Sequence, residues 1–246
     1  MEPKTYIDFK DRNSKEGEAT FDGIDCIVPH GGGLESMAAL AWAVDTGRKP
    51  VVWTYVVADI PGTHNLVLAA RKSADHFKVP FILSTETIPM EKFAITPGFI
   101  NVDNVTKIIA GNPQWPINAV IFGTNIEDSG KQRGMLKNIQ RSVEMIRNNE
   151  WEIHGLDWRK KLKTPLMLFP FEHNTKSEIY SFIKREHPTL IDYAWTCMNP
   201  SRVKEDKRWV PCRVCKKCVE YRGAIHRAEE AMLKVKIGKN YKDLLK

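Results

Sequence analysis

The stretch "IDCIVPHGGGLESMAALAWAVDTG", residues 24–47, decides the fold of this chain. Its beginning, IDCIV, is a short apolar run with β-branched residues, which is typical of a buried strand. Residues 35–47 contain several Ala and one Met and end at Gly47, which predicts a helix with a glycine at its C-terminal cap. Three consecutive glycines join the two segments. The stretch therefore predicts a strand, a glycine-rich turn and a helix, in that order.

The same alternation continues through the 246 residues. Further strands are expected over 49–57, 80–85, 118–125 and 162–169, and further helices over 64–77, 102–110, 134–148, 175–186 and 217–236. Thr175 with Glu178 three residues later forms a capping box. The strand interiors are apolar without period-2 alternation, which favours an α/β fold with a parallel sheet covered by helices on both faces. We expect a loose arm over 1–20, an α/β domain over 21–194, and a small cysteine-bearing module with a C-terminal helix over 195–246.

Composition narrows the class of protein. Apolar residues make up 42% of the chain, which supports a packed core. No run reaches the roughly 18 apolar residues that a membrane helix needs, and the N-terminus is too polar for a signal peptide. The formal charge of +7 is spread along the chain and is weak evidence for an anionic ligand. We expect a cytoplasmic protein with no membrane partner.

The glycine turn lies where ligands bind in parallel α/β sheets, after a strand and before a helix. A helix N-terminus offers unpaired N–H groups and a partial positive charge, and glycines let the backbone approach an anion closely. A phosphate group fits this setting, although a tight turn without a ligand has the same pattern. No Gly-Lys-Ser/Thr follows the glycines, and no third glycine completes a GxGxxG fingerprint.

Four of the five cysteines lie within 22 residues near the C-terminus, namely Cys197, Cys212, Cys215 and Cys218. In a cytosolic chain this clustering indicates metal rather than disulfides. Zn²⁺ held by four thiolates is the expected occupant, and four protein ligands leave no open position, so its role is structural. A [4Fe–4S] cluster and free buried thiols are the alternatives. Cys26 is expected to be a core residue of the first strand.

The segment GGGLES, residues 31–36, resembles the pyrophosphate loop Ser-Gly-Gly-x-Asp-Ser of the N-type ATP pyrophosphatases. Gly31 replaces the first Ser of that motif, and Glu35 replaces its Asp. Together with the four cysteines, the loop resembles the 7-cyano-7-deazaguanine synthase family. Similar stretches are TPLMLFPFEHNTKSEIYSF (164–182), YAWTC (193–197), VIFGTNIEDSG (120–130) and YVVADIPGTHNLVLAA (55–70). The resemblance thus covers about residues 24–226, and it implies an adenine-nucleotide alpha-hydrolase-like, Rossmann-like fold.

The resemblance also implies an activity. The family uses ATP and Mg²⁺ to adenylate the carboxylate of 7-carboxy-7-deazaguanine, lets ammonia attack, and dehydrates the resulting amide to the nitrile, preQ0. It implies a zinc-containing homodimer that needs no nucleic acid for this step. The residues implied to bind ATP are His30, Gly31, Gly32, Gly33, Leu34, Glu35 and Ser36. Those implied to bind the deazapurine are His64, Asn125, Asp128, Ser129 and Arg133. Catalytic roles fall to Ser36, Glu35, Lys176 and Asp128, and the four clustered cysteines bind zinc.

The chain departs from the family at three further places. KQRGM (131–135) stands where the family shows Tyr-Pro-Asp-Cys-Arg, Arg213 stands where a Gly follows the second module cysteine, and Gly62-Thr63 stands where Gln-Arg precedes the histidine. These departures fit a divergent or viral branch that serves tRNA or DNA modification. Two other functions compete: a zinc-containing pyrophosphatase of the tRNA thiolation type, and a nucleic-acid-binding protein with a decayed loop.

Overall fold

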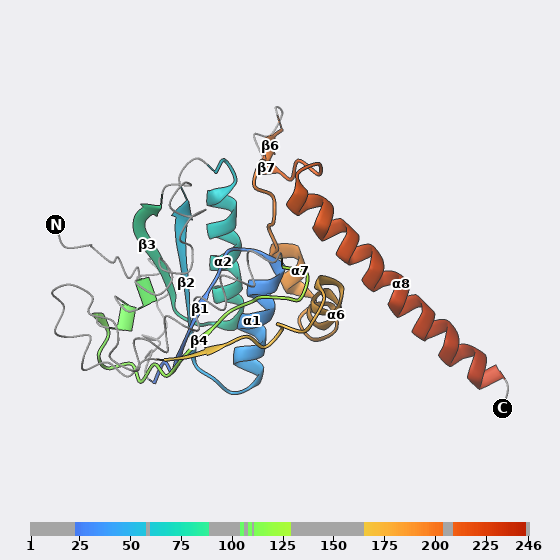
Figure 1. The fold of residues 1–246 in the computed structure, drawn as a ribbon, viewed down its shortest axis with the longest axis horizontal. Helices are drawn as coiled ribbons and strands as arrows, with labels where there is room; N and C mark the ends of the chain where they lie inside the picture. Colours follow the sequence, from blue (N-terminus) through green and yellow to red (C-terminus); the bar gives the residue numbers. More distant parts are fainter. Residues whose placement is uncertain are drawn as a thin grey trace, which may run out of the picture.

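The computed structural model describes residues 23–57, 60–88, 104–105, 108–109, 111–128, 165–203 and 209–244. The N-terminal arm over 1–20 and the helix over 134–148 that the sequence predicts lie outside these residues, as do Ser129 and Arg133. Figure 1 shows a sheet with helices packed against it and a long C-terminal helix that extends away from the sheet.

The predicted parallel sheet is confirmed. Its strands are β1 (Cys26–Pro29), β2 (Pro50–Val57), β3 (Phe81–Ile88), β4 (Ala119–Ile121) and β5 (Leu166–Leu168), in the order β3-β2-β1-β4-β5. All four pairings between neighbouring strands are parallel. The strand expected over 118–125 is shorter than predicted and ends at Ile121. It ends there because the following residues turn to bring Gly123 against the helix that begins at Leu34.

Both faces of the sheet are buried, as the unbroken apolar strands predict. One face of the sheet contributes Ile27, Val51, Trp53 and Val120 to a single apolar cluster. The residues that cover this face include Val105, Ile108, Ile109, Trp115 and Ile117, and the chain is helical at 104–105 and 108–109. Cys26, Val28, Val52, Ala119 and Ile121 belong to another cluster with helices α1 (Leu34–Asp45) and α2 (Thr63–Phe77). Successive strand residues therefore point to opposite faces. Complete burial of each Val or Ile stabilises the fold by about 1.5–3 kcal/mol.

The helix boundaries follow their capping residues. α1 ends at Asp45, and Gly47 after it has the positive φ of 76° that its predicted cap requires. α6 (Lys176–Glu186) begins with the predicted capping box: the Glu178 N–H donates to Thr175 Oγ1 at 3.3 Å, and the Thr175 N–H donates to Glu178 Oε2 at 2.7 Å. The short helix α7 (Thr189–Tyr193) follows.

The C-terminal part consists of a two-stranded antiparallel ribbon and one helix. The ribbon pairs β6 (Ser201–Arg202) with β7 (Trp209–Val210). α8 (Lys216–Leu244) is longer than the predicted 217–236, and it lies beside α6 before it extends past the rest of the chain (Figure 1). Tyr221, Ile225 and Met232 of α8 pack against the cluster that α1 and α6 share. The cysteine module is therefore joined to the sheet domain by packed side chains.

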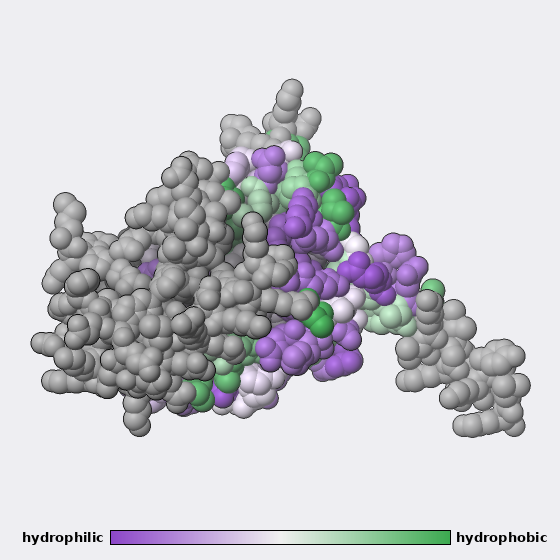
Figure 2. Space-filling view, in the orientation of Figure 1, coloured by the Kyte–Doolittle hydropathy of each residue, from purple (hydrophilic) through white to green (hydrophobic). Residues whose placement is uncertain are grey.

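The surface has no broad apolar face in the view of Figure 2, where the described residues show separate green spots among purple ones. The large apolar residues that are exposed among the described ones are Leu68, Ile126, Leu166, Val214, Val219 and Leu233. Scattered exposure of this kind is ordinary for a protein surface. Within the described residues, none of the helices combines the length and hydrophobicity needed to cross a bilayer.

Candidate functional site

The glycine loop lies at the point where the chain reverses its direction of travel across the sheet. β1 pairs with β2 on one side and with β4 on the other, and the loop from Gly31 to Gly33 joins β1 to α1. In open parallel sheets, ligands bind outside the carboxyl ends of the strands at this switch point. The sequence placed the loop after a strand and before a helix, and the structure places that junction at the switch point.

Two glycines are required by close backbone contacts. Gly32 has φ of 75°, and a Cβ added there would lie 2.5 Å from the Leu66 carbonyl oxygen in α2. A Cβ on Gly123, after β4, would lie 2.1 Å from the Glu35 carbonyl oxygen in the first turn of α1. Any larger side chain would push these backbones apart. The loop is thus held tightly between α2 and the segment that follows β4.

His30 is buried beneath the loop, with 3% of its surface exposed. Its Nδ1 accepts a hydrogen bond from the Gly32 N–H at 3.0 Å, so in the neutral ring the proton resides on Nε2. Burial lowers the pKa of His30 to about 3, which keeps the ring neutral near pH 7. Nε2 is buried and has no hydrogen-bond partner among the described residues. An orphaned buried donor costs about 1–3 kcal/mol, which an accepting ligand atom would recover.

Further unsatisfied polar atoms follow β4. Thr124 Oγ1 and Asn125 Nδ2 are buried without a hydrogen-bond partner in the described part of the chain. Asn125 Oδ1 accepts from the Glu127 N–H at 2.9 Å, and Asp128 Oδ2 accepts from the Asn125 N–H at 3.1 Å. The predicted substrate residues Asn125 and Asp128 therefore share one turn. The carboxyl edge between β1 and β4 offers polar groups to a ligand.

Lys176, the first residue of α6, is buried in a network of charges. Its Nζ lies 2.8 Å from Glu220 Oε2 in α8 and 3.6 Å from Glu35 Oε1 in the first turn of α1, directly after the glycine loop. Burial lowers the pKa of Lys176, but the hydrogen bond to Glu220 and the charges of Glu35, Glu220 and Asp128 outweigh it and raise the pKa overall. Lys176 is therefore a fixed cation at the loop.

Glu220 is a residue that the sequence did not single out. Burial raises its pKa, but the hydrogen bond and charge of Lys176 outweigh burial and lower the pKa overall, so the carboxylate is ionised. Its partner Lys176 is 44 residues away in the sequence, and no local spacing connects the two. Only the packing of α8 on α6 brings them together.

His64 lies in the first turn of α2 with its side chain exposed. Its ring meets the Trp209 ring of β7 edge-on, with the centroids 5.3 Å apart. Trp209 is another residue that sequence reasoning missed, because a single Trp in a two-residue strand carries no pattern. This pair lies beside the N-terminus of α2. His64 belongs to the sheet domain, and Trp209 belongs to the cysteine module.

The four clustered cysteines bring their sulfur atoms together. All four Sγ atoms lie within 4.8 Å of one another, and those of Cys197 and Cys212 are 3.5 Å apart. One tetrahedral Zn²⁺ with bonds of about 2.3 Å places its sulfurs roughly 3.8 Å apart, which these distances fit. A [4Fe–4S] cluster binds each thiolate to a different iron and holds the sulfurs farther apart. The donor set therefore fits a single ion.

Backbone groups support the cysteine turn. The Cys212 N–H donates to Cys197 Sγ at 3.2 Å, and the Cys215 N–H donates to Cys212 Sγ at 3.3 Å, as expected around thiolate ligands. Arg213 has φ of 64°, the left-handed region that glycine prefers, at the position where the resembled family has Gly. The Arg222 side chain donates to the Arg213 carbonyl at 2.7 Å and holds this turn.

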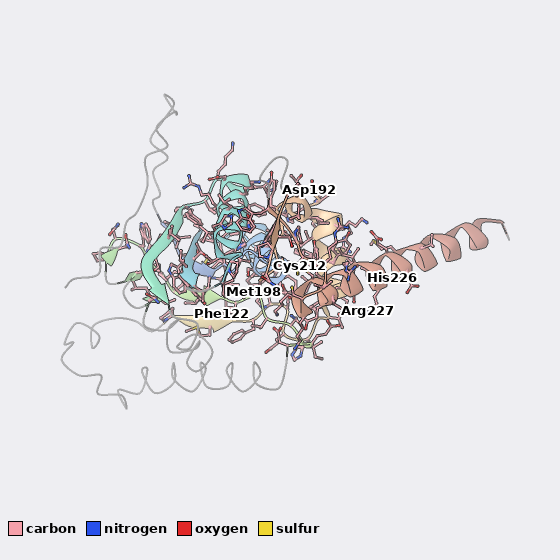
Figure 3. The ribbon with its side chains drawn as sticks, turned by 90° about the horizontal axis from the view of Figure 1, so that it is seen from above. Phe122, Asp192, Met198, Cys212, His226 and Arg227 are labelled. Carbon is pink, nitrogen blue, oxygen red and sulfur yellow. The ribbon has the colours of Figure 1, made fainter. Side chains whose placement is uncertain are left out.

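The cysteine module touches the glycine loop directly. The Trp195 N–H donates to the Gly32 carbonyl at 2.9 Å, and its indole Nε1–H donates to the Cys197 carbonyl at 2.9 Å. A Cβ on Gly62, the N-cap of α2, would lie 2.5 Å from the same Cys197 oxygen. Figure 3 shows Cys212 between the sheet and α8, with Arg227 farther along that helix. The four-cysteine site and the candidate nucleotide loop thus adjoin each other.

Comparisons with known proteins give only distant likenesses. No protein-family model matches the chain. No curated protein matches it either. A 4-thiouridine synthetase solved with RNA and bound ATP is 14% identical with a TM-score of 0.46, covering 77% of this chain but only 44% of that chain.

Two further solved structures are similarly distant. The U34-tRNA thiolase NcsA from Methanococcus maripaludis, solved with its [4Fe–4S] cluster, is 12% identical with a TM-score of 0.45, covering 91% of this chain and 73% of that one. NMN synthetase from Francisella tularensis is 12% identical with a TM-score of 0.32, covering 84% and 87% of the two chains. Likenesses this low assign no activity to the present chain.

Proposed function

We propose that this chain is an ATP-dependent carbon–nitrogen ligase that adenylates the carboxylate of 7-carboxy-7-deazaguanine and amidates it with ammonia. The product is the 7-amide or, after a second activation, 7-cyano-7-deazaguanine. One observation carries the proposal: a loop that resembles the pyrophosphate loop lies at the switch point of a parallel sheet, and Trp195 joins it by hydrogen bonds to Cys197 of the four-cysteine site. That combination is the one the sequence resemblance implies.

The chemistry explains the need for ATP. A carboxylate is a poor electrophile because its leaving group would be oxide. Its oxygen attacks the α-phosphorus of ATP and pyrophosphate leaves; ammonia then attacks the acyl carbon, and AMP leaves with the carboxylate oxygen. In a second round the amide oxygen attacks another ATP, pyrophosphate leaves, and loss of AMP and protons from nitrogen gives the nitrile. Catalysis of this kind consists mainly of positioning and charge neutralisation.

The loop residues have distinct roles in this proposal. Ser36 Oγ accepts from the Gly31 N–H at 3.2 Å, which leaves its hydroxyl proton to donate to a pyrophosphate oxygen. The resembled motif has a Ser hydroxyl at the position of Gly31, and glycine has no side-chain donor. In this proposal the neutral His30 Nε2–H supplies the missing hydrogen-bond donor. The N-terminus of α1 adds a partial positive charge, which favours phosphate.

The charged residues serve the metal and the phosphates. Carboxylate oxygens are the ligands that Mg²⁺ prefers, and Glu35 and Asp128 both act electrostatically on Lys176. Glu35 and Asp128 would hold Mg²⁺ here, and the ion would supply neutralisation of the charge that develops on the phosphates. Lys176 offsets part of the negative charge of Glu35. Zn²⁺, held by Cys197, Cys212, Cys215 and Cys218, would supply structural support without an open coordination position.

The cysteines favour this proposal over a tRNA thiolation enzyme. Sulfur transfer needs a reactive cysteine or a cluster with an open position. Four of the five cysteines form one compact site, and the fifth, Cys26, is completely buried in β1, where burial raises its pKa. A buried thiol with a raised pKa is a poor nucleophile. A nucleic-acid-binding protein with a decayed loop is recognised instead by salt-dependent binding without pyrophosphate release.

The deciding experiment is incubation with 7-carboxy-7-deazaguanine, ATP, Mg²⁺ and ammonium, followed by mass spectrometry of the base and measurement of AMP. We expect AMP together with the amide or the nitrile. Folded, zinc-loaded protein that forms neither AMP nor a new base would refute the proposed activity. Omitting ammonium provides the control, because the nitrogen of the product must come from it.

A further inference from the structure

We propose that Glu220 is a positioning residue that couples metal binding at the four cysteines to nucleotide binding at the glycine loop, by holding Lys176 beside Glu35. The inference rests on the proposed function, because a nucleotide is taken as the ligand of the loop. It adds a link between two sites that the proposed chemistry treats as separate.

The link consists of three charged side chains in a row. Glu220 lies in the second turn of α8, two residues after the cysteine ligand Cys218. Its Oε2 accepts a hydrogen bond from Lys176 Nζ at 2.8 Å, and the same Nζ lies 3.6 Å from Glu35 Oε1. The Lys176 side chain is 9% exposed. A buried cation cannot exchange one of its carboxylates for water without moving.

Metal binding fixes one end of this row. The turn from Cys212 to Cys215 leads directly into α8, and Cys218 is the third residue of that helix, so a metal–sulfur bond at Cys218 would fix the first turn of α8. Without the ion, the sulfurs lose their common partner and the first turn of α8 loses its anchor. Glu220 would then move from Lys176, and Lys176 would shift toward Glu35, which lies in the first turn of α1, directly after the loop. In this proposal the position of Glu35 beside the loop depends on the metal.

A second, backbone link runs in parallel. Trp195 bonds to Gly32 through its N–H and to Cys197 through its indole, and neither bond involves Glu220. A change at Glu220 therefore removes the side-chain link and leaves the backbone link in place. We expect such a change to reduce the coupling strongly without abolishing it.

Glu229 offers a matched control on the same helix pair. It bonds to Lys184 of α6 at 2.9 Å, so its ion pair joins α8 to α6 as the Glu220 pair does. That pair is exposed, with side-chain exposures of 40% and 52%, and it lies two turns farther from the cysteines. Substitution of Glu229 tests whether any loss comes from α6–α8 packing in general.

The test measures the zinc affinity of the metal-loaded chain by competition with a chromogenic chelator, with and without saturating ATP and excess Mg²⁺. Linkage requires that zinc and nucleotide strengthen each other by one common factor. For the unmodified chain we expect ATP to raise the zinc affinity by about 5-fold or more. Glu220→Gln should lose most of this factor, and Glu229→Gln should keep it. For each variant the factor is the zinc affinity with ATP divided by the zinc affinity without ATP. A change in zinc affinity that the lost charge causes equally in both conditions therefore cancels.

The outcomes separate this inference from the proposed function. If ATP does not bind at all, both fail. If ATP binds the unmodified chain but leaves its zinc affinity unchanged, the coupling alone is overturned, and this result needs no variant to fold. If ATP raises the zinc affinity of Glu220→Gln as much as that of the unmodified chain, Glu220 does not couple the two sites. The same conclusion follows if Glu229→Gln loses as much of this increase as Glu220→Gln does.

Discussion

At the scale of single residues, the glycine loop uses two of its own amides internally. The Gly31 and Gly32 N–H groups donate to Ser36 and His30, so a phosphate bound here relies on the later amides of the turn and on side-chain donors. This arrangement gives Ser36 and His30 a double task. Each side chain shapes the loop by accepting one bond and has a donor left for the ligand.

Ser36→Ala removes one such donor. We expect the rate of AMP formation, as kcat/KM, to fall by about tenfold or more, the value of a hydrogen bond to a charged acceptor. Zinc content should stay unchanged, because Ser36 Oγ accepts its hydrogen bond from the Gly31 N–H and not from the cysteine module. Steady-state kinetics with metal analysis checks both. Loss of zinc in this variant would contradict the assignment of Ser36 to the nucleotide.

His30 predicts a pH dependence of stability. Its folded pKa of about 3 lies below its ordinary value of 6.5, so the unfolded chain takes up the proton first as pH falls. The free energy of unfolding is therefore lost progressively between pH 6.5 and pH 3. At pH 5 the loss reaches about 2 kcal/mol relative to pH 7. Urea unfolding of the unmodified chain and of His30→Gln at pH 7 and pH 5 measures this loss of unfolding free energy. Equal losses in the two proteins would contradict its assignment to His30.

Residue-scale prediction from the sequence succeeded where the signal was local. The spacing of the four cysteines indicated one site, and their sulfurs do come together. The capping box of Thr175 and Glu178 formed as expected. Glu220 and Trp209 gave no such signal, because their partners Lys176 and His64 are distant in the chain and meet them only through packing.

At the scale of elements, apolar runs located the five strands, but their lengths depended on neighbours. β4 ends at Ile121 because Gly123 must approach α1, and the two-residue strands β6 and β7 depend on pairing with each other. α8 continues past its predicted end at 236, since the Lys and Leu residues that follow favour helix and Gly238 alone does not stop it. Tertiary contacts, which a single sequence does not display, set the boundaries of these three strands.

The contact between the glycine loop and α2 yields a prediction with a matched pair. Gly32 and Gly47 have nearly equal φ values of 75° and 76°, but a Cβ on Gly32 would strike Leu66, whereas one on Gly47 meets nothing within 4 Å. Gly47→Ala should cost about 1–2 kcal/mol, the strain of the left-handed conformation alone. Gly32→Ala should cost that amount plus the displacement of α2. Denaturant unfolding measures the loss of unfolding free energy in both variants. Equal losses would mean that displacing α2 has no energetic cost.

At the scale of the whole molecule, the sheet domain and the cysteine module meet at the nucleotide loop. Trp195, Gly62 and Glu220 each lie at this junction and come from three separate segments. The sequence alone predicted a domain over 21–194 and a module over 195–246, a division that stays a prediction. If the proposed metal and reaction are present, the contacts across this division give the metal an effect on the reaction, because its loss would disturb the loop as well as the module.

Cys215→Ser separates the metal from the fold, with Cys26→Ser as its control. Cys215→Ser removes one of four thiolates, so we expect the zinc content and the melting temperature to fall first, and AMP formation to fall as a consequence. Excess zinc should restore part of the stability, because a ligand that binds only the folded state stabilises it by mass action.

Cys26 lies completely buried in β1, so Cys26→Ser should lower the free energy of unfolding by about 1–3 kcal/mol while the zinc content stays unchanged. Zinc analysis beside thermal unfolding distinguishes the two variants. Full zinc content in Cys215→Ser would show that the four sulfurs do not share one ion.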